Sequence, residues 1–186
     1  MRKDLDNYEY GLAKIKFEEF FWKDFCDNYL ELIKVRVYKP ELFENGQEKK
    51  TSAQYTLHTV FENILKLIAP YLPFITEEIY QEYFKQAGET SIHTTAYPQT
   101  QAQENPYEKH FEILIQVIEQ VRKYKSEQQI SMGAELSNLT ITCTTDQQKS
   151  IRIFFDDILG VTKAKEITFQ EGNEISTTMT PIQIQA

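Results

Sequence analysis

The chain of 186 residues contains little cysteine, glycine or proline, with 2, 6 and 6 residues respectively. Cys26 and Cys143 lie far apart and neither belongs to a C-x-x-C pair, so the sequence predicts neither a disulfide framework nor a zinc site. The scarcity of glycine and proline excludes fibrous and low-complexity classes of protein. Hydrophobic residues make up 41% of the chain, which is enough to form a buried core.

The sequence also lacks a long apolar run and an apolar signal core at its N-terminus. The longest apolar stretch, residues 64–75, is interrupted by Lys66, Pro70 and Pro73 and is too short to cross a bilayer. Together with the unpaired cysteines, these absences predict a cytoplasmic protein without a membrane partner.

Positive charge is in deficit, since 20 Lys and Arg residues face 28 Asp and Glu residues and give a net charge of −8. Nucleic-acid binding rewards basic surfaces, so the total charge argues against such binding across the whole surface. The acidity is not uniform, however, because residues 1–40 carry as many basic as acidic side chains. The N-terminal segment is therefore the place where a local basic surface is expected.

Residues 1–104 show the apolar spacing of a helical bundle. A first long helix is expected over residues 8–38 and ends before Pro40, because the residue before a proline is pushed out of helical dihedrals. A capping box over residues 51–54 predicts a second helix to about Ile68, and Thr76 is expected to cap a third. On a wheel of about 100° per residue the first helix has a wide apolar arc. This arc contains Ile15, Phe21, Trp22, Phe25, Cys26, Tyr29, Leu32, Ile33 and Val37.

Residues 105–186 begin with a fourth helix, capped by Asn105, and then change to the alternating pattern of strands. Strands are expected over residues 139–143 and 163–169, separated by a short helix that Asp146 caps and Gly160 stops. Residues 175–184 form either a third strand or a tail. The fold class predicted for the whole chain is mainly α, a helical bundle over residues 1–104 followed by a small α+β module over residues 105–186.

The sequence contains no arrangement of residues typical of catalysis or metal binding. Its three histidines, His58, His93 and His110, do not have metal-ligand spacing, and neither a G-x-S-x-G elbow nor a glycine-rich phosphate loop is present. Adjacent carboxylates, such as Glu77 and Glu78, point to different faces of a helix. We therefore expect neither a catalytic residue nor a bound metal.

One aromatic residue falls outside the apolar arc of the first helix. Phe20 lies within the charged arc, between Lys16 and Lys23, and Phe17 lies at the edge of the same arc. An exposed ring between two ammonium groups suits stacking on an unpaired base while the cations meet phosphate. The alternative is that Phe20 packs under a loop, such as residues 41–50, or against another domain.

Several strings of the sequence are more specific than its periodicity. Residues 3–8 read KDLDNY, residues 20–31 read FFWKDFCDNYLE, residues 68–80 read IAPYLPFITEEIY, and residues 121–125 read VRKYK. These strings resemble the helical anticodon-binding domain of class I valyl-tRNA synthetases, and the resemblance covers most of residues 3–135. Tyr97 stands before Pro98 where that family usually has tryptophan.

The resemblance implies that the chain is the anticodon-binding region of a valine–tRNA ligase without its catalytic half. Its partners would be the anticodon stem-loop of tRNA and the catalytic domain of the same parent chain, which uses ATP. The fragment itself would be monomeric, would hold no cofactor and would carry no catalytic site. In the family, aromatic and basic side chains of the first long helix contact splayed bases. The positions expected to do so here are Lys16, Phe17, Phe20 and Lys23, with Tyr80 and Tyr83 on the third helix.

A second function class fits the composition. The acidity of the chain and the wide apolar arc of its first helix also suit a helical protein-interaction module that makes no RNA contact.

Overall fold

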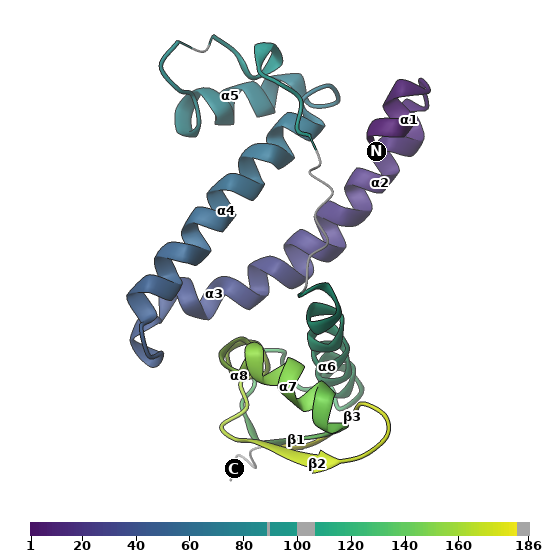
Figure 1. The fold of residues 1–186 in the computed structure, drawn as a ribbon, viewed down its shortest axis with the longest axis vertical. Helices are drawn as coiled ribbons and strands as arrows, with labels where there is room; N and C mark the ends of the chain where they lie inside the picture. The colour runs from purple at the N-terminus through teal and green to yellow at the C-terminus, as the bar shows by residue number, and fades with distance from the viewer. Residues whose placement is uncertain (89, 100–106, 182–186) are drawn as a thin grey trace. The chain divides into compact units, whose positions relative to one another are not determined.

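The computed structural model describes residues 1–88, 90–99 and 107–181. The chain folds into two compact units, one formed by Met1–Leu30 with Asn45–Ala102 and the other by Glu31–Glu44 with Gln103–Ala186 (Figure 1). The first unit is helical, and the second combines helices with a small sheet. A mainly α fold, with a helical bundle followed by a small α+β module, is therefore confirmed.

The first unit contains α1 (Arg2–Asp6), α2 (Tyr10–Glu19), the π-helix η1 (Phe20–Leu30), α4 (Gly46–Ile68), α5 (Pro73–Tyr83) and the short η3 (Ile92–Thr94). The second unit contains α3 (Glu31–Tyr38), η2 (Pro40–Leu42), α6 (Glu108–Glu127), β1 (Leu136–Cys143), α7 (Thr145–Ile153), α8 (Phe155–Thr162), β2 (Ile167–Glu171) and β3 (Ser176–Pro181). No helix in the described part of the chain combines the length and the apolar character that a membrane span requires.

The first long helix is built from three consecutive segments, α2, η1 and α3, and ends at Tyr38 before Pro40 as predicted. Its middle segment was not predicted to be a π-helix, in which each amide bonds to the carbonyl five residues earlier. A wheel drawn at about 100° per residue does not describe this wider turn. The wheel placed Trp22 among the buried residues, but 61% of the Trp22 surface is exposed.

A ladder of aromatic rings runs along α2 and η1 at intervals of four residues. The ring centroids are 5.7 Å apart for Phe17 and Phe21, 5.9 Å for Phe21 and Phe25, and 5.9 Å for Phe25 and Tyr29. The interplanar angles are 12°, 24° and 22°, so the rings are stacked. The ladder packs in one apolar cluster with side chains of α4, including Ile64.

The helix caps of the first unit differ from those predicted. α4 begins at Gly46, and the Thr51 hydroxyl donates to the Gln47 carbonyl oxygen within the helix, at 2.9 Å. α5 begins at Pro73, and the Thr76 hydroxyl donates to the Leu72 carbonyl oxygen at 2.8 Å. Both predicted caps are wrong, because α4 begins five residues before Thr51 and α5 begins at Pro73, three residues before Thr76, so each hydroxyl falls inside its helix.

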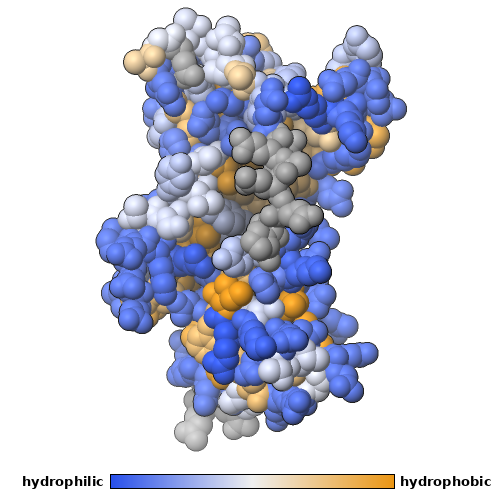
Figure 2. Space-filling view, viewed as in Figure 1, coloured by the Kyte–Doolittle hydropathy of each residue, from blue (hydrophilic) through white to orange (hydrophobic). Residues whose placement is uncertain are grey.

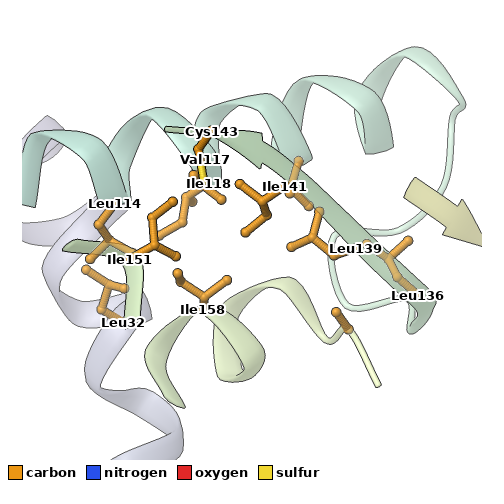
Figure 3. Close-up of a cluster of buried hydrophobic side chains, with 12 residues drawn as sticks. Leu32, Leu114, Val117, Ile118, Leu136, Leu139, Ile141, Cys143, Ile151 and Ile158 are labelled. Atoms are coloured by element: carbon orange, nitrogen blue, oxygen red, sulfur yellow. The ribbon is translucent and has the colours of Figure 1, made fainter. Parts of the chain in front are cut away.

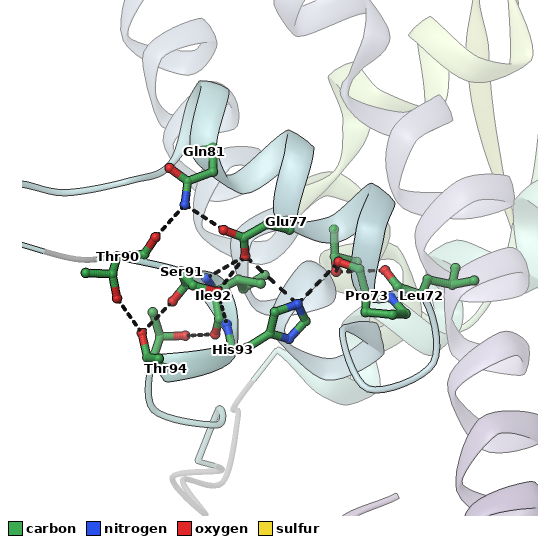
Figure 4. A network of polar contacts seen from close by, with 11 residues as sticks. Leu72, Pro73, Glu77, Gln81, Thr90, Ser91, Ile92, His93 and Thr94 are labelled. Carbon is green, nitrogen blue, oxygen red and sulfur yellow. Dashed lines mark hydrogen bonds and ion pairs between the residues drawn. The ribbon is translucent and has the colours of Figure 1, made fainter.

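A carboxylate of α5 holds the segment that follows the helix (Figure 4). Glu77 Oε2 accepts hydrogen bonds from the Ser91 hydroxyl at 2.8 Å and from the Ile92 amide at 3.0 Å. Glu77 Oε1 accepts from the Gln81 side-chain amide at 2.6 Å. The bonds from Ser91 and Gln81 lower the pKa of the Glu77 carboxyl. The bonds from Ser91 and Ile92 hold η3, whose Ile92 belongs to a cluster of buried residues.

The sheet of the second unit has the strand order β2-β1-β3, with β2 parallel and β3 antiparallel to β1. Of the two expectations for residues 175–184, the strand is the one observed, over Ser176–Pro181. The second strand begins at Ile167 rather than at residue 163, because Lys163 adopts a left-handed conformation, with φ of 58°, that closes α8.

The core of the second unit lies between β1 and the helices (Figure 3). Alternate side chains of β1 are buried, as the period of two predicted, while Thr140 and Thr142 are partly exposed. The helix after β1 is capped by Thr144 with Gln147, and the predicted cap Asp146 instead pairs with Lys149. The predicted cap Asn105 lies outside the described residues. The buried cluster contains Leu32, Leu114, Val117, Ile118, Val121, Leu136, Leu139, Ile141, Cys143, Ile151, Ile158 and Ala164.

α3 packs on α8 through a charged pair and a glycine. Arg36 Nε donates to Asp157 Oδ1 at 2.6 Å, and Arg36 Nη2 donates to Asp157 Oδ2, although Asp157 is only 4% exposed. A Cβ added to Gly160 would lie 2.8 Å from Val35 Cγ2, so this approach requires glycine. The segment Glu31–Glu44 therefore belongs with the second unit, whereas a division at residue 104 groups it with the first.

A lysine is buried in the same unit. Lys125, 1% exposed, directs its ammonium group at three carbonyl oxygens, those of Met132 at 2.9 Å, Ala134 at 2.7 Å and Thr162 at 2.9 Å. An ammonium group has three donors, so this group is fully bonded. Burial, with a smaller contribution from the nearby charge of Lys163, lowers the pKa of Lys125.

Replacing Arg36 leaves the Asp157 carboxylate buried without its cation. We expect Arg36→Leu to lower the free energy of unfolding by about 3–5 kcal/mol, the usual result of breaking a buried ion pair. The control is Lys34→Leu on the same helix, which removes only the exposed pair with Glu31 and costs about 1 kcal/mol or less. Urea denaturation of the two variants measures the difference, and equal losses would contradict the role given to Asp157.

Replacing Lys125 with methionine removes the donor to the Thr162 carbonyl, and we expect a loss of about 1–3 kcal/mol in the free energy of unfolding at neutral pH. The control is Lys123→Met, which changes an exposed lysine of the same helix.

Stability also depends on pH through this group. The folded-state pKa of Lys125 lies below its ordinary value of 10.5, so between these values the unfolded chain holds more protons than the folded one. Stability therefore rises with pH in that window, and below it the burial cost is fully present. The unfolding free energy of the wild type minus that of Lys125→Met should increase as pH rises toward 10.5. A flat or falling difference would mean that burial does not govern this ammonium group.

Candidate nucleic-acid interface

Phe20 and Lys23 are three residues apart at the start of η1. Phe20 is 39% exposed, and its ring makes no ring–ring contact with any residue that the structure describes. Lys23 is exposed, and its ammonium group forms no ion pair within the described ranges. The expected exposure of Phe20 is confirmed, and a free cation accompanies it.

Lys16, the other lysine expected to flank Phe20, is already paired with a carboxylate. Lys16 Nζ donates to Asp4 Oδ1 at 2.7 Å, and Asp4 is buried. The Lys16 hydrogen bond is the largest of the effects that lower the pKa of the Asp4 carboxyl. Lys16 therefore neutralises a buried carboxylate and is less available to a phosphate than Lys23.

Two predicted site residues lie in the core, which corrects the sequence-based expectation. Phe17 is buried as the first ring of the aromatic ladder, because α2 turns this residue toward α4. Tyr80 is fully buried with Leu65 and Ile92, and the Lys66 ammonium lies 6.0 Å from the centre of its ring. Neither ring has a free face at the surface on which a base can stack.

Tyr83 is exposed, but it lies on a different helix, at the end of α5. A hydrogen bond with Glu82 raises the pKa of the Tyr83 phenol. The structure thus places this ring beside a carboxylate, unlike Phe20, which has Lys23 three residues away.

Trp22 is a surface aromatic that the sequence analysis assigned to the core. Its ring meets Phe21 edge to face, with centroids 5.0 Å apart and an interplanar angle of 72°, while most of the residue is open to solvent. In the sequence, Trp22 lies between Phe20 and Lys23, and this position was the available sign of its exposure. The sign was missed because the apolar pattern does not reveal the π-helical turn.

The exposed residues of η1 can be compared with the rest of the described surface. Hydrophilic side chains cover most of the face drawn in Figure 2, and apolar side chains gather between them in smaller patches. In the described ranges, no three His, Cys, Asp or Glu side chains are grouped so that they could hold a metal ion. An exposed ring with an adjacent ammonium group can stack on a base and pair with a phosphate.

Comparisons with known proteins identify a family and several relatives of this chain. The family described as the anticodon-binding domain of tRNA ligase matches residues 1–140. The valine–tRNA ligase of Methanopyrus kandleri is 33% identical over 168 residues, which cover 89% of this chain and 18% of that protein. The valine–tRNA ligase of Anaplasma marginale is 40% identical over 143 residues, which cover 75% of this chain and 16% of that protein.

A third relative, the valine–tRNA ligase of Aquifex aeolicus, is 32% identical over 188 residues, which cover 95% of this chain and 16% of that protein. The chain spans less than a fifth of the length of each of these relatives. The family match extends over more than half of the chain and over the helices that carry Phe20 and Lys23. The chain therefore belongs to the family of anticodon-binding domains of tRNA ligases.

Proposed function

We propose that this chain is the part of a valine–tRNA ligase that binds the anticodon stem-loop of tRNA. The observation that carries the proposal is the exposure of the Phe20 ring and of the Lys23 side chain, three residues apart on η1, with no ion pair of Lys23 in the described ranges. Family membership and the names of the relatives support the same function. A loop of RNA presents unstacked bases, and such bases are recognised by stacking and by contacts with their edges.

In this function Phe20 stacks on one unpaired base and Lys23 meets the neighbouring phosphate. Trp22 supplies a second exposed aromatic surface, two residues further along η1. Each stacked base contributes about 1–3 kcal/mol of binding free energy, so one or two rings are sufficient for a specific contact. The net charge of −8 does not oppose this mechanism, because the contact needs a local cation rather than a basic surface.

Within the ligase, the chain would act by positioning. Holding the anticodon stem-loop would place the distant acceptor end of the tRNA at the catalytic domain of the same protein. That domain would use ATP and valine, and this chain would contribute binding energy and orientation but no reacting group.

Phe20→Ala should weaken binding of an anticodon stem-loop RNA by about 1–3 kcal/mol, because it removes the stacking surface. The matched control is Phe74→Ala, since Phe74 is 90% exposed on α5 and belongs to no site described above. Titration of the chain with the RNA, followed by fluorescence anisotropy, measures both affinities. If the two variants bind as tightly as the wild type, or if the chain binds no RNA at any salt concentration, the proposal fails and a protein-interaction module becomes the better description.

In a ligase that contains this segment, the same substitution separates recognition from chemistry. Phe20→Ala should lower the rate of tRNA charging and leave the activation of valine by ATP unchanged. Equal loss of both activities would assign Phe20 to the structure of the protein instead.

Lys23→Ala should reduce the salt dependence of RNA binding. A lysine that neutralises one phosphate contributes about 0.7–1 to the slope of log affinity against log salt concentration. Lys14→Ala is the control, because Lys14 lies on α2 and pairs with Glu18 at 2.9 Å. Affinities measured over a series of salt concentrations give the slopes, and an unchanged slope for Lys23→Ala would remove this residue from the interface.

A further inference from the structure

The first unit contains a cavity that the surface at Phe20 does not use. Its volume is about 660 Å³, and it is lined by residues of α1, by Tyr10 of α2, by Pro70 and Tyr71 after α4, and by Tyr97. Sites for small molecules usually have volumes of about 300–1,000 Å³, so the cavity is large enough for a nucleobase with its sugar.

Three tyrosines give the cavity aromatic walls. The Tyr71 hydroxyl donates to the Tyr10 carbonyl oxygen at 2.7 Å, which fixes the two walls relative to each other. Tyr97 is partly buried, and its burial raises the pKa of its phenol, an effect that the charge of Arg2 partly offsets. Arg2 lines the same cavity as this third ring. Planar aromatic walls favour a planar, stacking ligand over an aliphatic one.

Two charged side chains of α1 supply the polar part of the cavity. Arg2 and Asp6 are four residues apart, so they lie on the same face of this helix, and both line the cavity. Neither side chain forms an ion pair or a hydrogen bond with another residue in the part of the chain that the structure describes. The cavity thus presents an unused guanidinium, which only donates hydrogen bonds, and an unused carboxylate, which only accepts them.

We infer that this cavity binds a guanine base. Guanine offers two adjacent donors, N1–H and the N2 amino group, to a carboxylate, and two adjacent acceptors, O6 and N7, to a guanidinium. In adenine and cytosine the ring nitrogen next to the amino group carries no hydrogen, so neither base offers two adjacent donors to Asp6. The tyrosine rings stack on the faces of the base, and the arginine and the aspartate select it by its edges.

The base can come from a free guanine nucleotide or from an unpaired guanine of an RNA. Both present the same edges, so the recognition chemistry is shared. The inference does not depend on the function proposed for Phe20, because the cavity uses none of the residues of that surface.

The test uses the 186-residue chain and guanosine monophosphate as the probe, with adenosine monophosphate for comparison, by isothermal titration calorimetry. We expect guanosine monophosphate to bind about tenfold more tightly or better than the adenosine compound, the discrimination of one good bidentate pair. Asp6→Asn should weaken this binding by about tenfold, since an amide cannot accept two hydrogen bonds at the same edge. The control is Asp24→Asn, which changes an exposed aspartate of η1 outside the cavity.

Two further variants distinguish guanine binding in the cavity from the function proposed for Phe20 and from a loss of folding. Phe20→Ala should leave the affinity for guanosine monophosphate unchanged, and Tyr10→Leu should lower it while the far-UV circular dichroism spectrum stays that of the wild type. The affinity for an oligouridine with one central guanosine is compared with the affinity for the mononucleotide. The ligand that binds more tightly identifies the source of the base, and either outcome supports guanine binding in the cavity. Absence of binding, equal affinity for the two monophosphates, or an unchanged affinity in Asp6→Asn would overturn the inference.

Discussion

The stacked rings of Phe17, Phe21, Phe25 and Tyr29 are the contact on which the candidate interface depends. They recur every four residues, so they form one continuous apolar edge of α2 and η1, and this edge packs with side chains of α4. A helical segment can bury only one side in this way. Phe20 and Lys23 do not belong to the ladder, and their exposure follows from its position.

The same helical segment continues into α3, where its residues serve a different core. Leu32 lies in the buried cluster of the second unit, and Arg36 pairs with the buried Asp157. The residues that present Phe20 to solvent are thus followed directly in the chain by residues fixed in a packed module.

The distribution of ion pairs explains how an acidic chain can offer a cationic contact. Several lysines of the first unit are neutralised within it, as in the pairs of Lys14 with Glu18, Lys16 with Asp4, and Lys66 with Glu62. Lys23 forms no such pair within the part of the chain that the structure describes, and it lies three residues after the exposed Phe20. A surface on which several lysines are paired with carboxylates favours a small, defined contact over broad attraction to a polyanion, because its electrostatic field is short in range.

The amino-acid sequence by itself determined the helical bundle, the small α+β module and the end of the first long helix before Pro40. These features follow from periodicity and from proline, which act within a few residues of the chain. Only the tertiary structure decided that Phe17 and Tyr80 are buried, that Trp22 is exposed and that Lys16 is paired with Asp4. The reason is physical: the exposure of a ring and the partner of a charge depend on which distant segment covers them, and the π-helical turn altered the direction of side chains without changing the apolar pattern.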